Sequence, residues 1–355
     1  MAESSQSLSS AQPRTDALNS WLAAELNREG ITNYTIAPAS ADASFRRYFR
    51  ITSPAGTRIV MDAPPGQEDC RPFIKVAGLM RDAGVRAPEV LAQDVARGFL
   101  LLTDLGRQTY LDVINEDNAD RLFREANQTL IKWQLASRPD VLPAYREAQI
   151  AQELALFTDW YVGKHVAQRV TQPTGLTLND KQRNTLQSAF AAITQQALGQ
   201  GCVYVHSDYM PRNLMISEVP QDSAPGVLDF QDAVFGPVSY DIASLYRDAF
   251  ISWDEERVLD GTIRYWEQAR KAGLPMPAHF GDFYRDVEWM GLQRHLRILG
   301  IFARLNYRDG KPMYLADAPR FVNYVRKTSE RYGVLRPLLK LFDELKIGDT
   351  AVVGY

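Results

Sequence analysis

A small group of acidic and amide side chains in the second half of the chain has types and spacing that suit one kind of chemistry. His206, Asp208 and Asn213 form the pattern H-x-D-x-x-x-x-N, and Asp229 ends an apolar run that follows this pattern. Phosphoryl transfer from ATP uses a carboxylate that faces the attacking hydroxyl and oxygen ligands that hold Mg²⁺. We therefore predict that Asp208 is the catalytic residue and that Asn213 and Asp229 are metal ligands.

Three short runs with β-strand composition are placed to deliver these side chains. The run 203–205 leads into the loop that carries Asp208, and the run 214–216 leads out of this loop. The run 226–228 then ends at Asp229. Apolar runs bounded by polar turns are typical of strands, so the sequence predicts a strand, a loop and two further strands around one site.

The order of these elements resembles the aminoglycoside phosphotransferases and choline kinases, which are relatives of the protein kinases. The run LDFQDA, which begins at Leu228, is similar to the metal-binding motif of this family, where protein kinases have D-F-G. The run PVSYDIA at residues 237–243 is similar to a further motif of the family. The resemblance implies that Asp241 in this run and His206 at the start of the loop are structural supports of the catalytic loop.

The same resemblance implies the fold and its domains. We expect an α+β protein of the protein-kinase-like, two-lobed fold, with a small N-terminal lobe built on an antiparallel β-sheet and a larger, mainly helical C-terminal lobe. We divide the chain into a flexible tail at residues 1–14, a nucleotide-binding lobe at 15–104, and a catalytic and substrate-binding lobe at 105–355. Hydrophobic periodicity predicts strands at 34–38, 47–52, 58–61, 88–94 and 98–103, and helices at 71–83, 117–136, 149–164, 179–198, 254–271 and 280–305.

Length and composition set limits on location and partners. A chain of 355 residues exceeds the usual size of a single hydrophobic core, and its net charge of -3 gives no electrostatic reason to bind nucleic acid or an anionic membrane. The N-terminus lacks the pattern of a secretory signal, and no window reaches the roughly 18 apolar residues of a membrane helix. Cys70 and Cys202 are too few for a disulfide framework. We therefore expect a cytoplasmic monomer with free thiols and with no nucleic-acid or membrane partner.

Two segments of the N-terminal lobe are candidates for binding ATP. The turn 39–46 lies where a kinase folds a loop over the phosphates, and its small residues let backbone N–H groups come close. The resemblance makes Ser44, Phe45 and Arg46 the ATP contacts in this turn. The run that ends LLLTDLG resembles the hinge between the lobes, where main-chain groups hold adenine. The adenine candidates in this hinge are Leu102, Thr103, Asp104 and Leu105.

One family feature is missing from the third strand. The family places a lysine there, on the phosphates, and pairs it with a glutamate of the following helix. In this chain the strand reads Ile59-Val60-Met61-Asp62, without a lysine. One hypothesis is a reversed pair, with Asp62 on the strand and Lys75 on the helix. The alternative is that both are solvated surface charges.

Candidate substrate contacts lie in the C-terminal half. Glu153 sits in an aromatic stripe, Asp232 follows the metal-binding motif, and a basic set lies on the helix 280–305. Within this set, Arg297 and Arg304 are seven residues apart and so lie on nearly one face. Two guanidinium groups beside a cleft bind an anion well, whereas the alternative is an ordinary solvated basic face. The members of the basic set are Arg294, His295, Arg297 and Arg304.

Longer runs narrow the resemblance. The segments IVMDAPPGQED and ELALFTDWYVGKH and the C-terminal region look like those of bacterial kinases that act in peptidoglycan recycling. These enzymes use ATP and Mg²⁺ to phosphorylate the anomeric C1 hydroxyl of N-acetylmuramate and N-acetylglucosamine. The resemblance implies a small-molecule amino-sugar substrate, an α-1-phosphate product and a bypass of the fosfomycin-sensitive steps of cell-wall synthesis.

Two other functions stay open at this point. An aminoglycoside or other small-molecule phosphotransferase would share the same motifs, but aminoglycosides are polycations and the basic helix speaks against them. A nucleotide-binding pseudokinase would explain the missing strand lysine. The presence of Asp208, Asn213 and Asp229 together favours an active enzyme.

Overall fold

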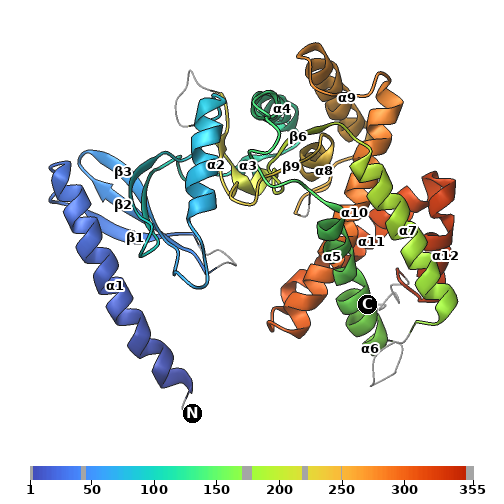
Figure 1. Cartoon of the computed structure of the whole chain (residues 1–355), viewed down its shortest axis with the longest axis horizontal. Helices are drawn as coiled ribbons and strands as arrows, with labels where there is room; N and C mark the ends of the chain where they lie inside the picture. The colour runs from blue at the N-terminus through green and yellow to red at the C-terminus, as the bar shows by residue number, and fades with distance from the viewer. Residues whose placement is uncertain (1–2, 41–44, 170–177, 218–222, 249, 349–355) are drawn as a thin grey trace. The chain divides into compact units, whose positions relative to one another are not determined.

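The computed structural model describes residues 3–40, 45–169, 178–217, 223–248 and 250–348. The chain forms two compact units (Figure 1). Unit 1 comprises Met1–Asn115 and Arg212–Asp232, and unit 2 comprises Glu116–Pro211 and Ala233–Tyr355. These units differ from the predicted boundary at residue 104, because unit 1 also takes in residues 105–115 and 212–232. The functional division into a nucleotide lobe and a substrate lobe stays a prediction.

Unit 1 is built on a five-stranded antiparallel sheet, and all five predicted strands are confirmed. The sheet follows an alternation that places Ile51, Val60 and Leu101 on one face, in a single hydrophobic core with the first helix. Tyr48 and Ile59 lie on the other face. In spatial order the strands are β1 (Thr35–Ser40), β2 (Arg47–Ser53), β3 (Gly56–Asp62), β5 (Phe99–Thr103) and β4 (Val90–Asp94).

Two helices lie on opposite sides of this sheet (Figure 1). Helix α1 (Glu3–Arg28) buries Leu22 and Leu26 against one face, and α2 (Arg71–Asp82) lies on the other. Helix α1 begins at Glu3, within the segment predicted as a tail at residues 1–14, and the flexibility of this segment stays a prediction.

A small hairpin completes unit 1 and carries two of the predicted site residues at its ends. Its strands are β7 (Leu214–Met215) and β8 (Gly226–Val227), and the short helix α3 (Tyr110–Val113) lies beside them. The backbone N–H of Val227 donates to the carbonyl of Arg86, at 2.7 Å. This bond attaches the hairpin to the rest of unit 1. Asn213 lies just before β7, and Asp229 lies just after β8.

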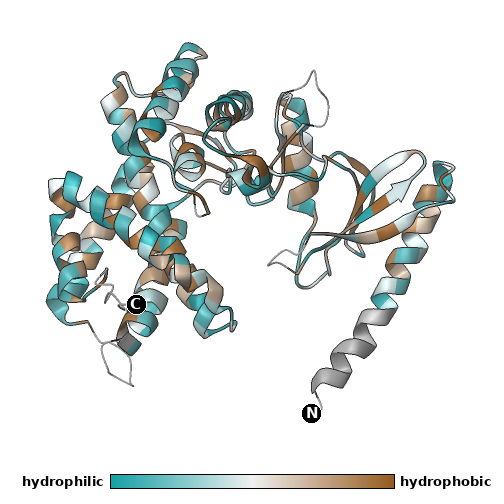
Figure 2. Cartoon of the chain, turned by 180° about the vertical axis from the view of Figure 1, so that it is seen from behind, coloured by the Kyte–Doolittle hydropathy of each residue, from teal (hydrophilic) through white to brown (hydrophobic). Residues whose placement is uncertain are grey.

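Unit 2 is mainly helical, as predicted. A pair of antiparallel strands, β6 (Cys202–Val205) and β9 (Val234–Pro237), lies among the helices. Hydrophobic and hydrophilic residues occur together along these helices, as expected when one side of each helix packs inward (Figure 2). The main helices are α4 (Ala119–Leu135), α5 (Glu147–Leu156), α7 (Asp180–Leu198), α8 (Tyr240–Tyr246), α9 (Glu255–Lys271), α10 (Phe280–Tyr307), α11 (Ala318–Arg331) and α12 (Arg336–Glu344).

One predicted helix changes its winding. The single α-helix expected at 149–164 is instead α5 followed by a π-helix, η1 (Phe157–Val166). Its buried residues explain this, because Phe157 and Val162, and likewise Tyr161 and Val166, are five apart and lie on one side of a π-helix. Helix α10 passes close by, and a Cβ at Gly300 would lie 2.3 Å from the carbonyl carbon of Leu156.

Two further expectations concern cysteines and membranes. Both Cys70 and Cys202 are free thiols, the first buried and the second exposed, as predicted. Within the described ranges, none of the helices combines the length and the apolar character that a bilayer crossing requires.

Candidate active site

The loop after β6 carries Asp208, and its backbone is hydrogen-bonded to the side chain of Asp241. The backbone N–H groups of His206 and Ser207 donate to the two carboxylate oxygens of Asp241, at 2.7 and 3.1 Å. Asp241 lies in the first turn of α8 and is fully buried. Burial raises the pKa of this carboxyl group to about 7, although the two amides and the nearby Arg294 act in the opposite direction. This is the contact that the predicted supporting role of Asp241 requires.

His206 is a packed residue of the same loop. Its side chain is buried, and its Nδ1 accepts a hydrogen bond from the backbone N–H of Asp208, at 3.2 Å. Its ring also meets Tyr209 edge to face. These contacts fit a residue that shapes the loop, as predicted, rather than one that takes part in proton transfer.

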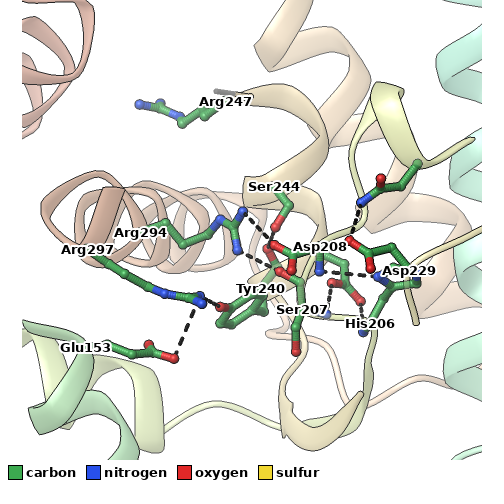
Figure 3. A network of polar contacts seen from close by, with 12 residues as sticks. Glu153, His206, Ser207, Asp208, Asp229, Tyr240, Ser244, Arg247, Arg294 and Arg297 are labelled. Carbon is green, nitrogen blue, oxygen red and sulfur yellow. Dashed lines mark hydrogen bonds and ion pairs between the residues drawn. The ribbon is translucent and has the colours of Figure 1, made fainter. Parts of the chain in front are cut away.

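Ser207 has a backbone conformation that is unusual for a residue with a side chain. Its φ is 80°, in the left-handed region, where the Cβ atom crowds the backbone. Such conformations persist where surrounding contacts hold them and are concentrated at functional sites. The carbonyl of Ser207 accepts a hydrogen bond of 2.8 Å from Arg294, and another nitrogen of this arginine lies 4.0 Å from the Asp208 carboxylate (Figure 3).

A second polar group in unit 2 surrounds Glu153. Its carboxylate accepts hydrogen bonds from Tyr145, at 2.7 Å, and from Gln293, at 2.6 Å. Arg297 lies 3.7 Å from the same carboxylate and donates to the hydroxyl of Tyr240, at 3.2 Å. Figure 3 shows Arg294 and Arg297 extending from α10 toward Asp208 and Glu153 respectively. Burial tends to lower the pKa of Arg297, but Tyr240 and Glu153 hold it above its usual value.

The other two members of the basic set on α10 have different surroundings. His295 lies inside unit 2, stacked on Tyr324 at 4.7 Å, and burial lowers its pKa to about 3. A neutral, enclosed imidazole is not placed to contact a substrate. Arg304 is half-buried, and its Nε has no hydrogen-bond partner among the described residues. Burial and the neighbouring Arg308 lower its pKa.

Unit 1 contains a cavity of about 260 Å³ on the face of the sheet opposite α1. The four predicted hinge residues and both predicted metal ligands line this cavity. Its apolar walls suit a flat aromatic base, and its polar end carries a carboxylate and an amide. The lining residues include Tyr48, Arg50, Ile59, Phe73, Leu102, Thr103, Asp104, Leu105, Gly106, Asn213, Met215, Leu228 and Asp229.

Asn213 and Asp229 lie side by side at the ends of the hairpin. The amide nitrogen of Asn213 is 3.4 Å from one carboxylate oxygen of Asp229, and Gln231 donates to the other, at 2.9 Å. Asp229 also has a left-handed φ, of 63°. No cluster of three His, Cys, Asp or Glu side chains able to hold a metal occurs in the described parts of the chain. One carboxylate and one amide still fit Mg²⁺, which keeps several waters and takes further oxygen ligands from phosphates.

Arg50 of β2 forms hydrogen bonds with the predicted hinge segment. Arg50 makes two hydrogen bonds to the carboxylate of Asp104, at 2.6 and 3.0 Å, and a third to the carbonyl of Gly106, at 2.6 Å. Burial alone would raise the pKa of Asp104, but Arg50 and the amide of Gly106 lower it. Both carboxylate oxygens of Asp104 therefore accept hydrogen bonds from Arg50.

The predicted phosphate-loop residues lie partly outside the described ranges. Ser44 is one of the residues that the structure does not describe. Phe45 is 62% exposed, and Arg46 pairs with Glu68 at 3.0 Å. Asp232 is exposed at the end of the segment that belongs to unit 1. A contact between these residues and ligands stays a prediction.

The hypothesis of a reversed Asp62–Lys75 pair is wrong, and so is the alternative for Asp62. The carboxylate of Asp62 is fully buried and is paired with Arg14 and Arg47. Side chains alternate along a strand, so Asp62 lies with Val60 on the α1 face and turns away from the cavity. The positions of β3 that point to the other face are Ile59 and Met61.

Several cavity residues were not identified from the sequence. Tyr48, Arg50 and Ile59 line the cavity, and Tyr145 and Gln293 organise Glu153. The alternation of side chains in β2 and β3 carries a signal for the first three, since Tyr48 and Arg50 are two apart on one face. Nothing in the local sequence marks Tyr145 or Gln293.

The chain is similar in sequence to a known protein family and to proteins of two bacteria. The profile described as "Phosphotransferase enzyme family" matches residues 35–276. A kinase of Pseudomonas aeruginosa is 51% identical over 316 residues, which are 89% of this chain and 90% of the relative. A kinase of Pseudomonas putida is 47% identical over 345 residues, which are 95% and 98% of the two chains. Both relatives are named N-acetylmuramate/N-acetylglucosamine kinase.

Solved structures show the same fold at low sequence identity. An ADP-bound aminoglycoside phosphotransferase, APH(2″)-Ib, has a TM-score of 0.55 and 14% identity, and covers 92% of this chain and 98% of its own. A choline kinase from Streptococcus pneumoniae has a TM-score of 0.58 and 11% identity, with coverage of 88% and 99%. These structures confirm the predicted protein-kinase-like α+β fold. The family profile matches more than half of the sequence, and the two Pseudomonas relatives are 51% and 47% identical to it. The chain therefore belongs to the phosphotransferase enzyme family.

Proposed function

We propose that this enzyme uses ATP to phosphorylate the anomeric C1 hydroxyl of N-acetylmuramate and N-acetylglucosamine, giving the α-1-phosphates. The observation that carries the proposal is the similarity to two relatives with that substrate pair in their names, at 51% and 47% identity over nearly their whole lengths. The alternatives are another small-molecule phosphotransferase and a nucleotide-binding pseudokinase.

In this reaction the residues of unit 2 handle the acceptor hydroxyl. Asp208 orients the C1 hydroxyl and accepts its proton while the hydroxyl oxygen forms a bond to the γ-phosphorus and ADP departs. The Asp208 side chain is 34% exposed, so a substrate reaches it. Asp241 and His206 fix the loop that presents this carboxylate.

The residues of unit 1 hold the nucleotide. Adenine fits between the apolar walls made by Ile59, Leu102 and Leu228, and the backbone of the hinge supplies hydrogen bonds to its edge. Asn213 and Asp229 would hold Mg²⁺, which when bound neutralises charge on the phosphates. Arg50 keeps the hinge segment in place by its bonds to Asp104 and Gly106.

The charges near Asp208 favour a neutral or acidic acceptor over an aminoglycoside. Arg294 and Arg297 are close to Asp208 and Glu153, and Arg304 lies two helical turns further along α10. A polycationic drug would meet like charges here, which is unfavourable. A sugar that carries a carboxylate, such as N-acetylmuramate, would not.

One observation favours the pseudokinase. β3 contributes Ile59 to the lining of the cavity, and its sequence contains no lysine that could reach a nucleotide there. Arg50, on the neighbouring strand, lines the same cavity, but its guanidinium is paired with Asp104 at the hinge. The catalytic and metal-binding residues are also held in defined positions, which a protein without catalysis does not require.

A substrate panel tests the proposal. The protein is incubated with Mg-ATP and, in turn, N-acetylmuramate, N-acetylglucosamine, kanamycin and choline, and ADP formation is measured. We expect ADP formation with both amino sugars and only background with the other two. ADP formation with kanamycin or choline alone would replace the proposal, and nucleotide binding without turnover on any acceptor would favour the pseudokinase.

Three further properties belong to this proposal. A cytoplasmic location and a monomeric state agree with the use of ATP and a small sugar. Resistance to fosfomycin would follow if the product enters nucleotide-sugar synthesis after the sensitive step. Cell fractionation tests the location, size-exclusion chromatography tests the monomeric state, and growth in fosfomycin tests the resistance.

A further inference from the structure

Arg294 has contacts that differ from those of a substrate-binding arginine. Its side chain is only 6% exposed, although it lies beside the loop of Asp208. One nitrogen donates to the carbonyl of Ser207 at 2.8 Å, and a second lies 4.0 Å from Asp208. Its guanidinium also covers the ring of Tyr240, 5.0 Å from the ring centre. The cation is therefore engaged on several sides by the protein itself.

The group that Arg294 binds is the one under strain. Ser207 is in the left-handed region, a conformation that is unfavourable for a residue with a side chain. Asp241 holds the N–H of Ser207 from α8, and Arg294 holds its carbonyl from α10 (Figure 3). Asp241 and Arg294 therefore bind the backbone N–H and the backbone carbonyl of the same residue, Ser207. Loss of Arg294 would remove one of these two backbone restraints on Ser207, and Asp208 is the next residue along the chain.

We propose that Arg294 is a positioning residue of the catalytic loop, which holds Ser207 in its strained conformation and so fixes Asp208, and that it does not read the substrate. The inference rests on the role given to Asp208 in the proposed function. It also assigns different tasks to neighbouring arginines of α10. Arg294 serves the loop, while Arg297 and Arg304 are left for the substrate.

Three variants on α10 test this inference. Arg294→Gln removes the charge, Arg294→Lys keeps it but loses the forked geometry, and Arg285→Gln removes an arginine of the same helix that pairs with Asp282 on its own helix. For Arg294→Gln we expect kcat to fall about 10- to 100-fold, the cost typical of a catalytic group displaced by about 1 Å. KM for ATP and for both sugars should change little. Arg294→Lys should recover part of the lost kcat, and Arg285→Gln should resemble the wild type.

A second measurement does not depend on activity. Hydrogen–deuterium exchange of the peptide that covers residues 203–210 reports how firmly the amides of His206 and Ser207 are held. We expect faster exchange there in Arg294→Gln, an intermediate rate in Arg294→Lys, and no change in Arg285→Gln. If Arg294→Gln does not fold, the lysine variant still gives both readouts.

The outcomes separate the two proposals. An increase in KM for N-acetylmuramate with unchanged kcat and unchanged exchange would make Arg294 a substrate contact and overturn the inference. Unchanged kinetics and exchange would also overturn it. If instead the wild type phosphorylates neither sugar, the proposed function fails, and the exchange rates still decide whether Arg294 holds the loop.

Discussion

At the scale of single residues, the proposed function depends most on the side chain of Asp208. Replacing it with asparagine preserves its size and most of its loop contacts but removes the proton acceptor. We expect Asp208→Asn to lower kcat by about 10²- to 10⁴-fold, with little change in affinity for ATP. Steady-state kinetics and nucleotide titration measure the two effects. A variant that keeps more than roughly a tenth of wild-type turnover would remove Asp208 from this role.

Arg50 carries a prediction for nucleotide binding. Lysine has a single ammonium and does not reproduce the two bonds to Asp104 together with the bond to Gly106. We expect Arg50→Lys to raise KM for ATP by about 10-fold, as a charged hydrogen bond is lost at the hinge, with kcat nearly unchanged. The control is Arg58→Lys on β3, which pairs with Glu29. Equal effects in both variants, or none in Arg50→Lys, would contradict this role.

The residues that were identified from the sequence share a local signal. Asp208, Asn213 and Asp229 are named by spacing within one segment and by the strands that flank them. Asp62 shows the limit of this approach, because its partner Arg14 is 48 residues away and lies on a different element. Such a partner is set by packing across the sheet, and no local pattern records it.

At the scale of elements, α10 carries a prediction about substrate choice. N-acetylmuramate differs from N-acetylglucosamine by a lactyl group with a carboxylate. Arg297 already has Glu153 as a counter-charge at 3.7 Å, whereas the Nε of Arg304 has no hydrogen-bond acceptor among the described residues, and the carboxylate of Asp309, which attracts Arg304, is paired with Arg308. We therefore expect Arg304→Gln to lower kcat/KM for N-acetylmuramate by about 10-fold and to leave N-acetylglucosamine unchanged.

Two matched variants make this test selective. Arg308→Gln changes an exposed arginine one turn further on, which pairs with Asp309, and should affect neither sugar. Arg297→Gln should weaken both sugars alike, because it disturbs the shared group around Glu153. Equal losses for the two sugars in Arg304→Gln would exclude Arg304 as the reader of the carboxylate.

The packing of α10 against α11 gives a dependence of stability on pH. The folded pKa of His295 is about 3, below the unfolded value of 6.5, because burial disfavours the charged ring. Between these values the unfolded chain binds the proton and the folded chain does not, so His295 lowers stability as pH falls below about 6.5. Urea unfolding between pH 8 and 5 should show wild type losing up to about 1 kcal/mol per pH unit relative to His295→Gln. His279→Gln, at an exposed position, should follow the wild type, and parallel curves for wild type and His295→Gln would contradict the assignment.

Helices and strands were mostly predictable because their periodicity is local. The five strands of the sheet and the long helices of unit 2 appear where apolar residues alternate or recur at helical spacing. The π-helix Phe157–Val166 was missed, since spacings of four and five are mixed there and were assigned to an α-helix. Helix α1 begins at Glu3, inside the predicted tail, where a serine-rich sequence with Pro13 carries no apolar periodicity that would indicate a helix.

At the scale of the whole molecule, one segment changes the domain division. Residues 212–232 follow the catalytic loop in sequence but belong to unit 1. The backbone of Ile216 bonds to that of Gln108, at 2.9 Å, and the backbone of Val227 bonds to that of Arg86. A sequence read from end to end suggests a single boundary, whereas these distant bonds make unit 1 discontinuous.

The most direct test of the proposed function is the position of the new phosphate on the sugar. The wild-type protein is incubated with Mg-ATP and N-acetylmuramate, and the product is examined by phosphorus NMR with coupling to the sugar protons. The proposed function predicts ADP and a single sugar phosphate whose phosphorus couples to the anomeric proton, in the α configuration, with no such product in Asp208→Asn. A phosphate on any other hydroxyl, or no sugar phosphate from a protein that binds ATP, would contradict it.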